Sequence, residues 1–216
     1  MPNRSYGQHC AVAKSLDIVG DRWTLLIVRE LLDRPQRYGD LLAGLAPIAT
    51  DMLASRLRDL ERHGLARKRE LAKPASGNVY ELTADGRALE DVINAFARWG
   101  RHLLTTRAPT DVVRPEWLAR AVRAYVRPDR TGEDLVVRLA TPQGGATVRI
   151  TADEVLDESD DVAADVILTG DVDVLAAALD PGRVPDLVSA GRLHIAGEPS
   201  AVRRLTKMFA LPRVRV

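Results

Sequence analysis

The sequence predicts an α+β protein with a helical first half that contains one β-hairpin and a second half that forms a separate α+β domain. The first observation is a change in the spacing at which apolar residues recur. The spacing is helical over residues 10–62, strand-like over 65–82 and helical again over 83–104. The second is the change after residues 107–115, beyond which short strand-like and helix-like segments alternate. We therefore expect a domain over 1–106, a linker over 107–115 and a domain over 116–216.

Composition fits a folded protein of two modest domains. The chain has 216 residues, of which 46% are hydrophobic and 28% charged. Aromatic residues make up only 4%, so the cores must consist mostly of Leu, Val, Ile and Ala. The net charge of +1 favours no class of partner, so any electrostatic argument must rest on local patches.

Several classes of protein are disfavoured by what the sequence lacks. The single cysteine, Cys10, excludes an internal disulfide framework and a cysteine-based zinc site, and it suits a reducing cytoplasm. The N-terminus lacks the apolar core of a signal peptide, and no apolar run approaches the ~20 residues of a membrane span. The four histidines lack metal-ligand spacing, and no catalytic motif stands out. We expect a cytoplasmic protein that is not an enzyme and has no metal, cofactor or membrane contact.

The first half is expected to contain five helices and one hairpin. The expected elements are helices over 10–19, 20–32, 38–45 and 49–64, strands over 65–71 and 78–82, and a helix over 83–104. Asp21 and Thr50 are well placed as N-caps, and Gly64 as a helix terminator. The third and fourth helices suit a helix-turn-helix, with the hairpin as its wing.

The fourth helix has one apolar and one polar side. On a helical wheel Leu53, Leu57 and Leu60 fall together. The opposite side carries Asp51, Ser55, Arg58 and Arg62. Guanidinium and hydroxyl groups on such a helix suit the major groove of double-stranded DNA. The alternative is an ordinary solvated surface helix.

The predicted DNA contacts divide by position. The N-terminal part of the second helix of a helix-turn-helix reaches the bases. The expected base-reading residues are Thr50, Asp51, Ser55 and Arg56. Arg58 and Arg62, further along the helix, are expected to meet phosphate, and the wing adds Lys68, Arg69, Lys73 and Ser76.

Three separated motifs resemble the HxlR-type winged helix-turn-helix regulators. They are "HCAVAKSLDIVGDRWTLLIVRELL", "RPQRYGDLLAGLAPIATDMLASRLRDLERHGLARKRE" and "VYELTADGRALEDVINAFARWGRHL", within about residues 8–103. The resemblance implies a homodimer formed by the first helix and the helix after the wing, with Trp99 and the segment around Cys10 near the interface. Core packing is the alternative for Trp99. Family members often have Ser and Lys where this chain has Ala49 and Asp51, so the DNA sequence recognised is in question, and Thr50 would have to supply the cap.

The same resemblance suggests a redox role for Cys10. Some members sense electrophiles or oxidants through a cysteine at this motif. His9 is adjacent and Lys14 lies one helical turn later, and a nearby cation or helix N-terminus favours the reactive thiolate. The alternative is a small buried apolar side chain.

The second half resembles the sterol carrier protein type two domain. Its expected strands cover 133–140, 146–153, 164–170 and 191–197, in a mixed or mostly antiparallel sheet, and its expected helices cover 171–180 and 198–211. The resemblance rests on residues 164–211, including "AGRLHIAG", and implies an apolar cavity for lipid-like molecules. Its expected wall residues are Leu175, Leu179, Val188, Leu205, Met208 and Phe209. The alternative is that these side chains fill a solid core.

Two functions follow from these expectations. The first is a homodimeric DNA-binding transcriptional regulator, a repressor, that a small hydrophobic effector in the second domain controls. The second is a carrier of lipid-like molecules in which the winged helix serves only dimerisation.

Overall fold

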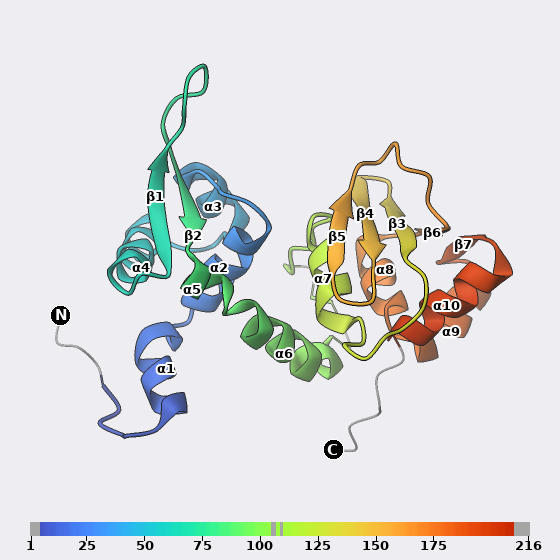
Figure 1. Cartoon of the computed structure of the whole chain (residues 1–216), viewed down its shortest axis with the longest axis horizontal. Helices are drawn as coiled ribbons and strands as arrows, with labels where there is room; N and C mark the ends of the chain where they lie inside the picture. The colour runs from blue at the N-terminus through green and yellow to red at the C-terminus, as the bar shows by residue number, and fades with distance from the viewer. Residues whose placement is uncertain (1–4, 105–106, 109, 210–216) are drawn as a thin grey trace. The chain divides into compact units, whose positions relative to one another are not determined.

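The computed structural model describes residues 5–104, 107–108 and 110–209 (Figure 1). The chain forms two compact units, residues 1–93 and 94–216. This division falls within a helix near the end of the expected first domain, and the expected domain limits stay a prediction. Each unit is described by itself.

The first unit has the predicted order of elements. It contains α1 (Ala11–Val19), α2 (Thr24–Asp33), α3 (Tyr38–Gly44), α4 (Thr50–Arg62), β1 (Ala66–Glu70), β2 (Asn78–Leu82), α5 (Ala84–Arg87) and the start of α6 (Glu90–Gly100). The loop between β1 and β2 projects beyond the helices (Figure 1). The helix-turn-helix with a β-hairpin wing is therefore confirmed.

One apolar cluster holds this unit together. Leu53, Leu57 and Leu60 of α4 are at most 1% exposed and pack in the same cluster as Ile27 and Leu31 of α2. The three leucines lie on one side of α4 because residues three and four apart share a helix face. The predicted apolar stripe is confirmed, and it fixes which side of α4 faces outward.

The base of the wing is tied to the segment between α2 and α3. β1 and β2 pair antiparallel, with Lys68 opposite Tyr80. The Gln36 amide donates to the Tyr80 carbonyl oxygen at 3.0 Å, and the Tyr80 amide donates to the Gln36 carbonyl oxygen at 2.8 Å. This bridge adds a third backbone partner to the two-stranded ribbon, which holds the wing against the helical body.

Two expected N-caps are wrong. α2 begins at Thr24 with Trp23 at the N-cap, because the Asp21 carboxylate forms an ion pair with Arg56 instead. Thr50 is the first residue of α4, and no side chain caps the helix at Ala49. The Asp51 carboxylate accepts from the Met52 amide at 2.9 Å, so it satisfies one free N–H of the first turn.

The single helix expected over residues 83–104 is divided. α5 ends at Arg87, α6 follows from Glu90, and a 3-10 turn (Arg101–Leu103) ends the segment. The Thr83 hydroxyl accepts from the Gly86 amide at 3.2 Å and caps α5. A Cβ at Gly86 would lie 1.9 Å from the Leu65 carbonyl oxygen, so only glycine allows α5 to pack this closely.

The second unit, which begins within α6, is an α+β domain with one mixed sheet. Its further elements are α7 (Trp117–Tyr125), β3 (Leu135–Thr141), β4 (Gly144–Ile150), β5 (Val155–Glu158), β6 (Val166–Thr169), α8 (Val172–Ala178), η2 (Pro181–Arg183), α9 (Val184–Ser189), β7 (His194–Gly197) and α10 (Pro199–Phe209). The strand order is β5-β4-β3-β6-β7, with β3 and β6 parallel and the other neighbours antiparallel. The mixed sheet is confirmed, whereas α7, β5 and α9 were not predicted.

The core of the second unit is aliphatic, as its composition predicts. α7 contacts β4 and β5, and α10 contacts β6. The fully buried side chains include Leu118 of α7, Leu135 and Leu139 of β3, and Leu175 of α8. These helices bury the apolar positions of the sheet.

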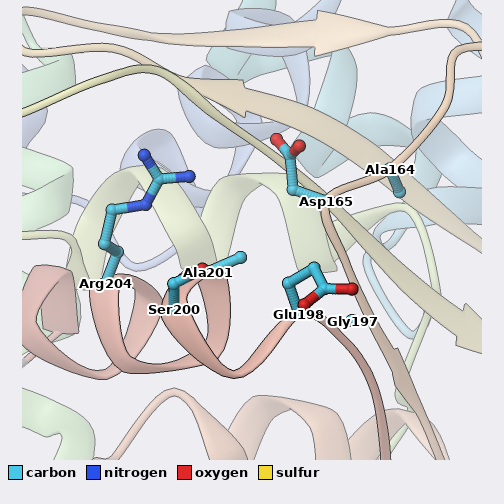
Figure 2. Close-up of a pocket in the computed structure, with 7 residues that line it drawn as sticks. All are labelled: Ala164, Asp165, Gly197, Glu198, Ser200, Ala201 and Arg204. Atoms are coloured by element: carbon cyan, nitrogen blue, oxygen red, sulfur yellow. The ribbon is translucent and has the colours of Figure 1, made fainter.

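An open polar groove of about 630 Å³ lies beside the start of α10 (Figure 2). Asp165, Glu198, Ser200 and Arg204 supply its polar lining. The Asp165 carboxylate accepts from the Val136 amide at 2.8 Å, which fixes it to the edge of β3. The groove therefore differs in character from the apolar cavity that the sequence predicts.

Candidate nucleic-acid interface

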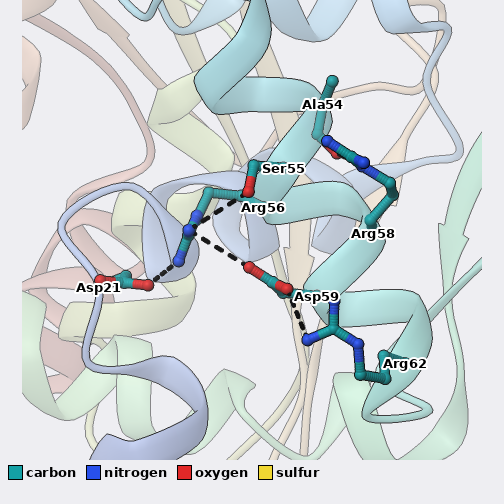
Figure 3. A network of polar contacts seen from close by, with 7 residues as sticks. All are labelled: Asp21, Ala54, Ser55, Arg56, Arg58, Asp59 and Arg62. Carbon is teal, nitrogen blue, oxygen red and sulfur yellow. Dashed lines mark hydrogen bonds and ion pairs between the residues drawn. The ribbon is translucent and has the colours of Figure 1, made fainter. Parts of the chain in front are cut away.

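The outward side of α4 carries most of the predicted DNA-binding side chains. Thr50, Asp51, Arg58 and Arg62 are exposed, and Ser55 is half-buried. Figure 3 shows Ser55, Arg58 and Arg62 along α4. The Arg58 Nε donates to the Ala54 carbonyl oxygen at 3.2 Å, which keeps this side chain close to the helix. The predicted polar side of α4 is thus open to solvent in this chain.

Arg56 departs from the prediction that it reads bases. Its guanidinium forms ion pairs with Asp21 and with Asp59, the latter at 3.3 Å, and its side chain is only 18% exposed. Figure 3 shows it directed towards these two carboxylates rather than outward. Since both partners belong to the protein, the assignment of Arg56 to base reading is corrected.

The wing presents several cations. Lys68, Arg69, Lys73 and Ser76 are exposed, as predicted for a surface that meets DNA. Glu81 of β2 is buried and accepts from Arg69 Nε at 2.7 Å and Arg67 Nε at 2.8 Å. These hydrogen bonds, Arg69 first, lower the pKa of the Glu81 carboxyl below its usual value. One carboxylate therefore orients two guanidinium groups while it balances only one of their charges.

Arg37, at the N-cap of α3, is a further exposed cation near the wing that the sequence did not reveal. A Cβ on Gly77 would lie 3.0 Å from its Nη1, and Gly77 has φ +94°. Glycine therefore lets the wing loop approach this guanidinium. No local pattern indicates this approach, because the two residues lie far apart along the chain.

Large apolar side chains are exposed on α6 and α1. On α6, Trp99 is 68% exposed, Phe96 55% and Val92 41%. On α1, Val12 and Leu16 are exposed. Core packing of Trp99 within one chain is therefore wrong, and the α6 side chains share one helix face at i, i+4 and i+7 spacing. Such a face is typical of a surface that a partner covers.

Cys10 is exposed and lies at the N-cap of α1, so its interpretation as a buried apolar residue is wrong. The backbone N–H groups of Ala13 and then Val12 lower the pKa of the Cys10 thiol. The Lys14 ammonium instead lies 3.7 Å from the Asp17 carboxylate. The helix N-terminus, rather than this lysine, favours the thiolate.

The six predicted wall residues of the second unit do not surround a large cavity. Leu175, Leu179, Leu205, Met208 and Phe209 are buried in the core cluster. Val188 is 45% exposed, because it lies on the outer side of α9. Only Leu205 and Phe209 of the six line an apolar cavity, of about 50 Å³. Pockets for small molecules usually enclose about 300–1,000 Å³.

The residues that the structure describes contain neither a membrane-spanning helix nor a cluster of metal ligands. Within residues 5–104, 107–108 and 110–209, no helix has the length and apolar character needed to cross a bilayer. In the same residues, no three His, Cys, Asp or Glu side chains gather where they could hold a metal ion.

The fold and the cationic surface of the first unit define a winged helix-turn-helix DNA-binding protein. The sequence profile described as HxlR-like helix-turn-helix matches residues 18–108. An HTH-type transcriptional regulator of Mycobacterium bovis is 32% identical over 136 residues, which cover 62% of this chain and 85% of the relative. The chain belongs to the HxlR-like family of helix-turn-helix transcriptional regulators.

Two further similarities involve Bacillus subtilis proteins. The HTH-type transcriptional regulator YdeP is 37% identical over 92 residues, which cover 42% of this chain and 71% of YdeP. The crystal structure of quinone-bound YodB is 27% identical, covers 42% of this chain and 96% of YodB, and has a TM-score of 0.37. The resemblance of the second unit to a sterol carrier domain stays a prediction.

Proposed function

We propose that the protein is a homodimeric transcriptional repressor that binds double-stranded DNA through α4 and the wing. The observation that carries the proposal is that α4 has a buried apolar side and an exposed cationic side. Its leucines lie in the core, while Arg58 and Arg62 are exposed, and the cationic wing belongs to the same unit. A helix with this division can enter the major groove, and a hairpin can follow the neighbouring backbone.

Within this proposal the residues have separate tasks. Thr50, Asp51 and Ser55, at the start of α4, meet base edges, and Arg58 and Arg62 meet phosphate. The wing contacts the backbone or minor groove beside that site through Lys68, Arg69, Lys73 and Ser76. Arg37 adds a cation near the wing loop.

The homodimer supplies the second recognition helix. The exposed apolar side chains of α6 and α1 support this state, since association would remove them from water. A two-fold dimer presents two copies of α4 to half-sites about one helical turn apart. A dimer bound across a promoter blocks the polymerase, which makes repression the expected output.

The second unit is proposed to respond to a small hydrophobic effector. The present cavity of about 50 Å³ is too small for a lipid-like molecule, so binding requires α10 to move away from the sheet. The effector changes DNA affinity only if it binds one dimer geometry better than the other.

The test is binding in graded salt to a duplex enriched by selection from random-sequence DNA. A regulator gives a specific complex, and the logarithm of its affinity falls by about 0.9 per phosphate contact for each tenfold rise in salt. Arg58→Ala should reduce the magnitude of this slope by about 0.9, the amount expected for one phosphate contact. The matched control is Arg192→Ala, which removes an exposed guanidinium paired with Asp173 in the second unit. Weak, sequence-blind binding would instead favour the carrier function.

Cys10 is proposed as a reactive thiol that electrophiles modify. Because its pKa is lowered, alkylation by iodoacetamide should reach half its maximal rate at a lower pH than alkylation of a cysteine in an unstructured peptide measured in the same buffer. Mass spectrometry of the alkylated protein measures this, and Cys10→Ser provides the blank because the chain has no other cysteine. A midpoint at or above that of the peptide cysteine would contradict the proposal. A Cys10→Ser protein that a quinone still releases from DNA would exclude a sensing role.

A further inference from the structure

We propose that Arg56 is a positioning residue, which joins the recognition helix α4 to the segment after α1 through Asp21 and Asp59. This inference rests on the proposed function, because the quantity that Arg56 controls is the placement of α4 on DNA. It gives a role within the protein to a side chain whose place near the start of α4 predicts base reading.

Two carboxylates hold the Arg56 guanidinium from two elements. Its Nη1 pairs with Asp21, which lies between α1 and α2, and its Nη2 lies 3.3 Å from Asp59 Oδ2, one turn along α4. Nη2 also lies 3.4 Å from Ser55 Oγ. Figure 3 shows the guanidinium between the two carboxylates. The planar, branched donor group of arginine can bridge two acceptors in this way.

Asp59 extends the network to the outer side of α4. Its Oδ1 accepts from Arg62 Nη1 at 2.9 Å, and the Arg62 side chain is 67% exposed. One carboxylate therefore joins the largely buried Arg56 to an arginine proposed to contact phosphate.

A direct contact between Arg56 and DNA is disfavoured by the same geometry. A phosphate would have to displace Asp21 or Asp59, and the Arg56 side chain is only 18% exposed. Its Nε is buried without a hydrogen-bond partner. The buried polar group stays in place because the two ion pairs hold it, and loss of one partner leaves a charge poorly compensated.

The link to Asp21 gives the network a further consequence. Asp21 follows α1, the helix that carries Cys10 at its N-cap and exposes Val12 and Leu16. The Arg56–Asp21 ion pair therefore joins α4 to the residues that follow α1.

The experiment uses the full chain, the selected duplex and a double-mutant cycle. Arg56→Gln should weaken binding about tenfold without changing the salt slope, whereas Arg58→Ala lowers that slope. Asp21→Asn should weaken binding in the same way. The double variant should bind no more weakly than Arg56→Gln alone, because both changes break one connection.

Provided that the wild-type chain binds specifically, any of three results would overturn the inference. Arg56→Gln could bind DNA with unchanged affinity, or its salt slope could be smaller by the amount of about one phosphate contact. In the double variant, the losses of affinity caused by the two substitutions could multiply. If Arg56→Gln does not fold, Asp21→Asn decides, since the Asp21 side chain is 57% exposed. An unaltered affinity of that variant overturns the inference. A wild-type chain without specific binding removes the proposed function as well.

Discussion

Replacing Trp99 by aspartate is expected to convert the proposed dimer into a monomer and to weaken binding of the selected duplex by about 100-fold or more. Trp99 is the most exposed large apolar residue of α6 and shares a helix face with Phe96 and Val92. In the proposed dimer a carboxylate at this position would be buried against a second apolar face, which is unfavourable because the charge loses its water. The monomer then presents one copy of α4 and loses the gain from binding two half-sites together.

Light scattering coupled to size-exclusion chromatography measures the mass, and the graded-salt assay measures the affinity. The matched control is Leu156→Asp, which places the same charge at an exposed apolar position of β5. This control should stay dimeric and bind DNA like the wild-type chain. A Trp99→Asp protein with the mass of a dimer would assign the apolar side of α6 to another partner.

Local pattern predicted most of the first unit because its elements are set by neighbouring residues. The spacing of Leu53, Leu57 and Leu60 fixed both the length of α4 and its buried side. The prediction that Arg56 reads bases rests on its place early in α4, whereas the wheel puts Arg58, and not Arg56, opposite the leucines. Their difference arises from Asp21, a residue distant in sequence whose position depends on how α2 packs against α4.

The remaining errors have the same origin in tertiary contacts. The break between α5 and α6 depends on the approach of Gly86 to the Leu65 carbonyl, which no helical period indicates. In the second unit, five of the six side chains predicted to line a cavity are buried in the core cluster. It could not show whether they surround a cavity, because the free volume depends on how α10 meets the sheet.

Replacing Leu57 by alanine is expected to lower the free energy of unfolding of the first unit by about 2–5 kcal/mol. Leu57 is 1% exposed and packs in the cluster that joins α4 to α2, so the truncation removes apolar burial and leaves a cavity. For a unit of this size the midpoint of thermal unfolding should fall by roughly 10 °C or more. DNA binding should weaken as well, because α4 loses the contact that fixes its orientation.

Urea unfolding monitored by hydrogen exchange and mass spectrometry reports on the stability of each unit separately, because peptides from residues 1–93 and from residues 94–216 are measured individually. The control is Leu26→Ala on α2, which removes the same atoms from a side chain that is 36% exposed. Leu57→Ala should increase exchange in the first unit and leave the core of the second unchanged, whereas Leu26→Ala should change little in either. Equal effects of the two substitutions would mean that α4 is not held by its leucine stripe. The outward placement of Arg58 and Arg62, on which recognition of DNA depends, would then lose its physical basis.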